Sequence, residues 1–181
     1  MKVLPSSATT LLVIGIHREE LAFGEAVAAR LDRSRFDVLN IPEGLSGRHP
    51  RPDQRFHFDT LHRALYLQLL PHIQTRHKWV IDLHTGLDPH GPSADIYCRD
   101  TLLLVESLTK ANGIQLAPRL ISLLPEAAVP SAETVIPPDI WRSPRFLYVG
   151  VEIYLPGTGA GRLIDQNYAC ALLNALSAEP L

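Results

Sequence analysis

Four residues of types that bind metal ions or transfer protons lie within or just after three short apolar segments. The residues are His17, Glu20, His84 and Glu152. The three segments, each typical of a buried strand, are 11–16, 79–83 and 146–154. In open α/β sheets, sites form at the carboxyl ends of the strands, so we expect these side chains to meet there. Two imidazoles and one carboxylate match a catalytic zinc site, and a second carboxylate can serve as its base.

Each of these residues also has a purely structural interpretation when it is taken alone. A His-x-x-Glu pair is common, His84 is compatible with a hydrogen-bonded histidine at a strand end, and Glu152 with an ion pair to arginine. Their joint occurrence at three strand ends favours the metal site. Asp82 lies two residues before His84 and therefore on the same strand face, where it can accept a hydrogen bond from a ligand imidazole or hold an arginine.

Length and composition indicate an ordinary globular protein, with residues 1–181 forming a single domain. The net charge of −2 and the absence of a Lys/Arg run argue against nucleic-acid binding. Cys98 and Cys170 belong to no CxxC motif, so a disulfide framework is not expected. The first fifteen residues run into His17 without a cleavage site, and no apolar run approaches membrane-span length, so we expect a cytoplasmic protein.

Strand-like and helix-like segments alternate along the chain. The expected strands are 10–16, 36–41, 78–84, 94–98 and 146–154, and the expected helices are 19–32, 59–70, 101–112 and 162–177. Residues 114–124 are ambiguous between strand and loop because Pro118 disfavours a central strand. The two remaining segments, 42–56 and 125–145, are predicted to be long loops. This alternation predicts an α/β fold, a three-layer α/β/α sandwich around a mainly parallel, mixed sheet.

Three motifs, in the same order and with similar spacing, resemble those of the aspartoacylase and succinylglutamate desuccinylase family of the zinc carboxypeptidase superfamily. Segment 13–20 (VIGIHREE) resembles the family's G-x-H-G-x-E, and segment 80–86 (VIDLHTG) resembles its D-L-H-T. Segment 149–153 (VGVEI) resembles the strand with the catalytic glutamate, and 159–178 resembles the helix after it. The resemblance implies a zinc carboxypeptidase-like fold.

The resemblance also implies roles for the four residues. His17, Glu20 and His84 would bind one zinc ion per chain, and Glu152 would take a proton from water and pass it to the leaving amine. Family members cleave amide bonds and hold the substrate carboxylate with arginines. Here Arg18 replaces the family's glycine after the first histidine. The family's larger members have a β-rich domain after the last helix, which this chain lacks, so we expect a more open pocket.

The family's Asn-Arg pair has no clear counterpart in this sequence. Leu61-His62-Arg63 is a formal candidate but falls inside a predicted helix. We therefore favour the loop arginines for binding a substrate carboxylate, with Arg55 and Arg48 ranked ahead of Arg51. Tyr154 lies two residues after Glu152 and either contacts substrate or packs against its neighbours. His62, His72 and His77 are expected on helix surfaces or in turns.

These observations favour a zinc-dependent hydrolase that cleaves an amide bond of an N-acyl amino acid or a related small carboxylate-bearing substrate. Two alternatives remain: a zinc carboxypeptidase acting on a small or cell-wall-type peptide, and a family member that binds a metal or ligand without catalysis. The sequence does not determine the acyl group, the amino acid, the physiological metal or whether the chain forms a homo-oligomer.

Overall fold

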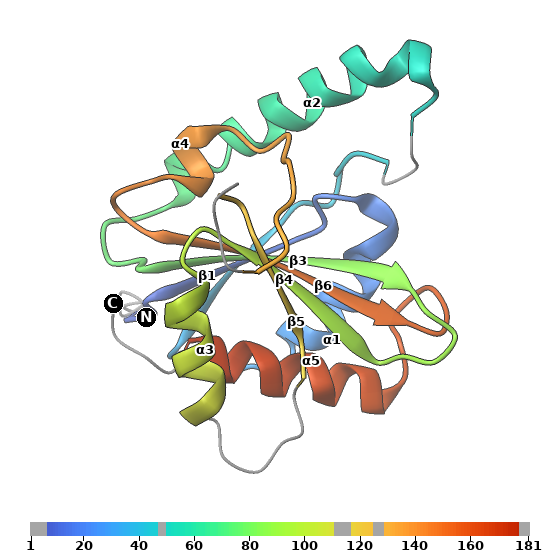
Figure 1. Ribbon diagram of the computed structural model, residues 1–181. Helices are drawn as coiled ribbons and strands as arrows, with labels where there is room; N and C mark the ends of the chain where they lie inside the picture. Colours follow the sequence, from blue (N-terminus) through green and yellow to red (C-terminus); the bar gives the residue numbers. More distant parts are fainter. Residues whose placement is uncertain (1–6, 47–49, 111–116, 125–128, 178–181) are drawn as a thin grey trace, which may run out of the picture.

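The computed structural model describes residues 7–46, 50–110, 117–124 and 129–177, and within these ranges six strands form one mixed sheet. The strands are β1 (Thr10–Ile14), β2 (Phe36–Asn40), β3 (Trp79–Leu87), β4 (Ser93–Cys98), β5 (Arg119–Ser122) and β6 (Leu147–Leu155). Their spatial order is β2-β1-β3-β6-β4-β5 (Figure 1). All neighbouring strands pair in parallel except β4 and β6, which are antiparallel.

Helices cover both faces of the sheet, which gives the predicted three layers (Figure 1). The helices are α1 (Leu21–Ala28), α2 (Arg55–Leu67), α3 (Thr101–Lys110), α4 (Pro138–Trp141) and α5 (Leu163–Leu176), with 3-10 turns η1 (Arg18–Glu20), η2 (Pro52–Gln54) and η3 (Leu70–His72). One apolar cluster joins α1, α3 and α5 to one sheet face, and a second joins α2 and α4 to the other.

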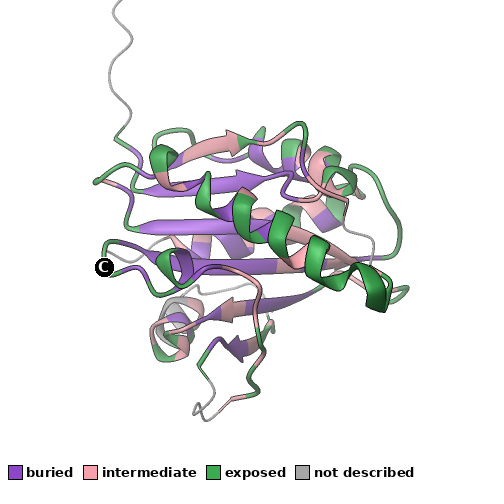
Figure 2. Ribbon diagram, turned by 90° about the horizontal axis from the view of Figure 1, so that it is seen from above, coloured by how far each residue is buried: buried purple, intermediate pink, exposed green. Residues whose placement is uncertain are grey.

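The two faces differ in how closely their helices are packed. Strand β1 is buried along its whole length, as its apolar sequence TLLVI predicts. Helix α2 is largely exposed, and its buried residues are His62 and Tyr66 (Figure 2).

No helix in the described ranges is both long enough and apolar enough to cross a bilayer.

Several predicted boundaries were wrong. Helix α2 begins at Arg55 rather than near Asp59, and it therefore uses part of the predicted loop 42–56. Pro52 opens the preceding turn η2, where its fixed φ suits the first helical position. The ambiguous segment 114–124 contains the short strand β5. The predicted end of the helix 101–112 lies outside the described residues.

Gly15 shapes the connection between β1 and His17. Its φ is +84°, a conformation that favours glycine, and a Cβ there would lie 2.6 Å from the carbonyl oxygen of Ile41. This close approach lets segment 41–45 continue alongside β1, where the amide of Arg18 donates to the oxygen of Leu45 at 2.9 Å. The backbone around His17 is therefore held on both sides before any metal binds.

We expect Gly15→Ala to lower the free energy of unfolding by more than about 1 kcal/mol, because alanine resists this φ and its methyl group would meet backbone. Urea unfolding of the metal-free protein measures the change. Gly157→Ala is the matched control, because a Cβ at Gly157 meets no atom within 4 Å. Equal stability of the two variants would contradict the role assigned to Gly15.

Candidate metal centre

Parallel pairing of β1 with β3 brings His17 close to His84. Ile14 at the end of β1 pairs with Leu83, so both histidines follow positions that lie side by side at the carboxyl edge of the sheet. The chain then turns through η1, which returns the side chain of Glu20 toward His17. Residues 64 or more positions apart in sequence are thus joined by strand register, as the sequence pattern requires.

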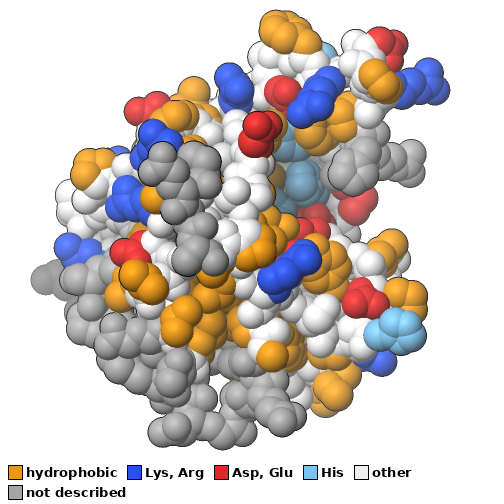
Figure 3. Space-filling view, viewed as in Figure 1, with side chains coloured by type: hydrophobic (Ala, Val, Ile, Leu, Met, Phe, Trp, Pro, Cys, Tyr) orange, Lys and Arg blue, Asp and Glu red, His pale blue; other side chains and the backbone are white. Residues whose placement is uncertain are grey.

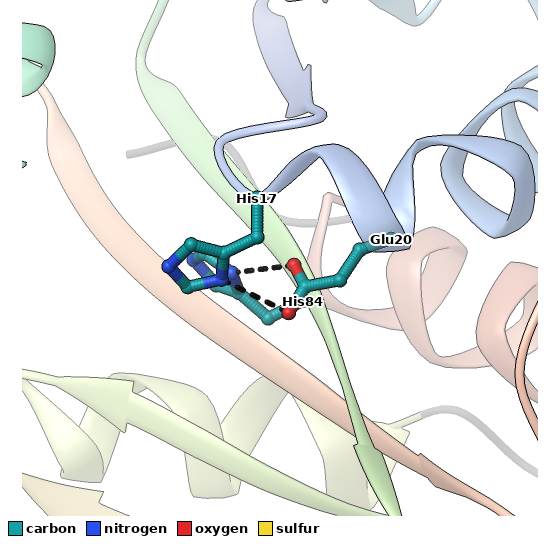
Figure 4. A group of neighbouring side chains, drawn as sticks. All are labelled: His17, Glu20 and His84. Atoms are coloured by element: carbon teal, nitrogen blue, oxygen red, sulfur yellow. Dashed lines mark hydrogen bonds and ion pairs between the residues drawn. The ribbon is translucent and has the colours of Figure 1, made fainter. Parts of the chain in front are cut away.

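The two imidazoles lie next to each other, and the Glu20 carboxylate faces both of them from one side (Figure 4). Its Oε1 is 3.0 Å from Nδ1 of His17, and its Oε2 is 2.9 Å from Nδ1 of His84. One ligand-type atom from each residue lies within 4.8 Å of the other two. All three side chains are partly buried, with 12% to 20% of their surface exposed.

Opposite charges within the cluster shift the pKa values of Glu20 and His84. Burial alone would raise the pKa of Glu20, but His17 and His84 more than offset this effect and lower it. Burial would likewise lower the pKa of His84, yet the Asp82 and Glu20 carboxylates raise it well above its ordinary value. The Glu20 carboxylate therefore favours a proton on Nδ1 of His84.

Asp82 orients His84 from the opposite side of the ring. The Asp82 side chain is completely buried, and its Oδ2 lies 2.9 Å from Nε2 of His84. The same oxygen accepts hydrogen bonds from the hydroxyls of Tyr66 at 2.7 Å and Tyr148 at 2.9 Å. Burial would raise the pKa of Asp82, but His84 and the two tyrosines hold it below its ordinary value. The carboxylate thus keeps a proton on Nε2 and leaves Nδ1 to face the cluster.

Glu152 lies on the strand next to His84, and the two residues are direct partners in the β3–β6 ladder. Its Oε2 is 3.4 Å from the hydroxyls of both Tyr97 and Tyr154. A Cβ on Gly86 would lie 3.0 Å from Oε1 of Glu152, so this glycine leaves space for the carboxylate. Among the described residues, the group of three converging ligand atoms does not include Glu152, which is consistent with a base beside the metal rather than a ligand.

Tyr154 packs beside Glu152 and also contacts a second carboxylate. Its hydroxyl is 3.0 Å from Oδ2 of Asp95, closer than it is to Glu152. Asp95 is buried, and its Oδ1 accepts a hydrogen bond from Nε of Arg119 at 2.9 Å. Burial, followed by the Glu152 charge, raises the pKa of Tyr97 to about 12, so this hydroxyl stays protonated and able to donate. The structure thus shows a polar contact for Tyr154, and contact with substrate remains a prediction.

His62 was wrongly predicted to lie on a helix surface, whereas His77 ends a turn, as predicted, with its amide donating to the oxygen of Gln74 at 2.9 Å. Both are buried, and Nε2 of His62 lies 3.1 Å from Nε2 of His17. Burial lowers the pKa of His62. The sequence did contain a signal, because His62 and Tyr66 are four residues apart and share one helix face. His77 lies elsewhere, where its Nε2 is 2.8 Å from Asp37.

A hollow of about 740 Å³ reaches His62, whose Nε2 contacts His17, but its lining includes none of His17, Glu20, His84 and Glu152. Figure 3 shows histidine and acidic side chains recessed in the region below α2. Arg18 and Arg51 line the hollow together with apolar Phe58 and Leu61. Arg55 is not among the lining residues. Its side chain is 75% exposed and lies 3.9 Å from Asp59, and Arg48 lies outside the described residues.

The donor set fits a divalent transition metal. Two imidazole nitrogens and a carboxylate are the three protein ligands typical of catalytic zinc sites, which keep a further position open. Nδ1 of His84 faces a carboxylate oxygen of Glu20, so both atoms are available to the same ion. Nε2 of His84 is hydrogen-bonded to Asp82 and is not available. The arrangement therefore provides three convergent ligands, one imidazole fixed from behind, and a neighbouring carboxylate.

The fold is that of zinc carboxypeptidase-like proteins, which confirms the fold class predicted from the sequence. No protein-family model and no curated protein matches the chain. Among solved structures, murine aminoacylase 3 has a TM-score of 0.53 at 14% identity, over 97% of this chain and 65% of that protein. The zinc-free form of YNDL has a TM-score of 0.54 at 15% identity, over 97% and 88% of the two chains. A Shewanella denitrificans protein assigned as a metallopeptidase has a TM-score of 0.50 at 16% identity, over 94% of this chain and 74% of that protein.

These similarities concern the fold, since every identity is below one fifth. The chain spans just under two thirds of the length of murine aminoacylase 3. The resemblance noted in the sequence is thus confirmed at the level of the fold.

The raised pKa of His84 predicts a pH dependence for the metal-free protein. Its contribution to stability is complete below the ordinary histidine pKa of about 6.5 and is lost as pH rises through the higher folded-state value. We therefore expect the unfolding free energy of wild type, relative to His84→Gln, to fall as pH rises above about 6.5. Urea unfolding in the presence of a chelator measures this difference, and a difference that grew with pH would contradict the assignment.

Proposed function

We propose that the chain is a zinc-dependent hydrolase that cleaves the amide bond of an N-acyl amino acid or a related small, carboxylate-bearing substrate. The observation that carries the proposal is the convergence of His17, Glu20 and His84 beside Glu152 on the adjacent strand. The fold shared with murine aminoacylase 3 supports a hydrolase of this kind.

In this proposal each residue acts on a stated atom. His17 and His84 would bind the metal through Nδ1, and Glu20 through its carboxylate. The bound ion would polarise the amide carbonyl and make water more acidic, which is what zinc supplies in such sites. Glu152 would take the proton from the attacking water and deliver it to the leaving nitrogen. Tyr97 and Tyr154, both within 3.4 Å of Oε2, would hold that carboxylate in place.

Arginines beside the cluster would bind the substrate carboxylate. Arg18 and Arg51 line the hollow and Arg55 does not, so within the described residues we favour Arg18 and Arg51 for this role. Guanidinium groups suit carboxylates because they donate two parallel hydrogen bonds. The apolar side chains of Phe58 and Leu61 would contact the acyl group or the amino-acid side chain.

A zinc peptidase is the second candidate. The hollow of about 740 Å³ is within the range of sites that hold drug-sized ligands, and it has room for more than a small acyl group. The same three ligands and the same base would serve either reaction.

Metal content tests the metal centre directly. We expect near one zinc per chain in wild type purified without a metal-affinity tag, and little in His84→Ala, because a ligand is lost. Elemental analysis measures the ratio, and exposed His72, mutated to alanine, is the control. A wild type that holds no zinc, even after zinc is added, would contradict the proposal.

Glu152→Gln tests the catalytic role. We expect the variant to keep its zinc and to lose a factor of about 100 to 10,000 in kcat, because glutamine cannot accept the proton. Turnover is measured on N-acyl amino acids, dipeptides and tripeptides, with exposed Glu25→Gln as the control. Near wild-type activity in Glu152→Gln would exclude this mechanism. Faster hydrolysis of peptides would favour the peptidase, and zinc binding without any hydrolysis would favour the non-catalytic alternative.

A further inference from the structure

His62 is a buried imidazole with a polar partner for each ring nitrogen. Its exposed fraction is 4%, although it lies on the mostly exposed helix α2. Nδ1 lies 2.8 Å from the carbonyl oxygen of Phe58, and Nε2 lies 3.1 Å from Nε2 of His17. The ring of Phe58 packs against it, with centroids 3.9 Å apart and the ring planes tilted by 36°. Both nitrogens and one ring face of His62 are therefore fixed by neighbours.

The hydrogen-bond partners determine where the protons lie. A carbonyl oxygen only accepts, so Nδ1 of His62 must donate its hydrogen to Phe58. A neutral imidazole has one N–H, so Nε2 of His62 is an acceptor. The facing Nε2 of His17 must then be the donor. This places a proton of His17 on Nε2 and makes Nδ1, 3.0 Å from Oε1 of Glu20, the ring nitrogen that faces the cluster.

We propose that His62 is a positioning residue that fixes the tautomer and ring orientation of His17 for metal binding. It does for His17 what Asp82 does for His84, since each partner holds the Nε2 proton of one ligand histidine. The two supports differ in charge. Asp82 is a carboxylate, whereas His62 is a neutral imidazole that orients its partner without adding negative charge to the centre.

His62 is placed behind His17 rather than beside the metal. Its Nε2 contacts the nitrogen of His17 that points away from Glu20. In the part of the chain that the structure describes, the converging group of ligand atoms consists of His17, Glu20 and His84. His62 is therefore not a fourth ligand, and its effect on the metal must pass through the His17 ring.

This inference rests on the metal centre of the proposed function but not on amide hydrolysis. Its tests therefore measure zinc affinity and proton positions instead of turnover. A wild type that binds zinc but cleaves no amide would contradict the proposed function and leave the role of His62 intact.

Two amide variants separate the contact with His17 from simple packing. In His62→Gln the side-chain oxygen reaches about the position of Nε2, where it can accept a hydrogen bond from His17. In His62→Asn the shorter amide reaches only the position of Nδ1, where it can still donate to the oxygen of Phe58. We expect His62→Asn to weaken zinc binding by about 10- to 100-fold and His62→Gln to retain most of the affinity. Chelator competition measures affinity, His72→Gln is the control, and thermal unfolding of each metal-free variant verifies folding.

Wild-type affinity in both variants, or an equal loss in both, would overturn the proposal. Nitrogen-15 NMR of the histidine rings of wild type provides a test without any substitution. The expected spectrum has a proton on Nε2 of His17 and on Nδ1 of His62, with none on Nε2 of His62. A proton on that last nitrogen would overturn the proposal, and the metal-free protein gives the same reading even if wild type binds no zinc.

Discussion

The candidate site depends on the hydrogen bonds and the ion pair made by the buried carboxylate of Asp82. A fully buried charge is costly unless it is paired and hydrogen-bonded. Its partners come from three different elements: Tyr66 on α2, Tyr148 on β6 and His84 on β3. All three contact Oδ2, so this one oxygen fixes the helix, the sheet and the imidazole of His84 relative to one another.

Helix α2 illustrates how structure and function share these contacts. Its two buried residues, His62 and Tyr66, bond to His17 and Asp82, respectively. The helix thus docks on the sheet through polar groups of the site as much as through apolar packing. Substitutions in this network are expected to affect both helix docking and metal geometry, and so metal-free stability must be measured beside metal affinity.

The core of the site was predictable from sequence because strand register obeys simple rules. His17 and His84 each follow an apolar strand, and parallel strands align their carboxyl ends. His62 was missed because its burial depends on where α2 begins and on which face it presents. The apolar residues of the helix do not mark that face, because Phe56, Leu61 and Leu67 are exposed whereas His62 and Tyr66 are buried. The ranking of the loop arginines had no such rule behind it, since loop positions depend on tertiary contacts rather than on periodicity.

The cluster is compensated before a metal arrives. Without a cation, the Glu20 charge would be costly among partly buried groups, but the two Nδ1 atoms face its oxygens and His84 retains a proton there. A metal ion would replace that proton while Asp82 continues to hold the one on Nε2. The apolar clusters on the two sheet faces do not depend on this exchange. In the proposed function, metal binding would therefore release protons from the site without a change in either apolar cluster.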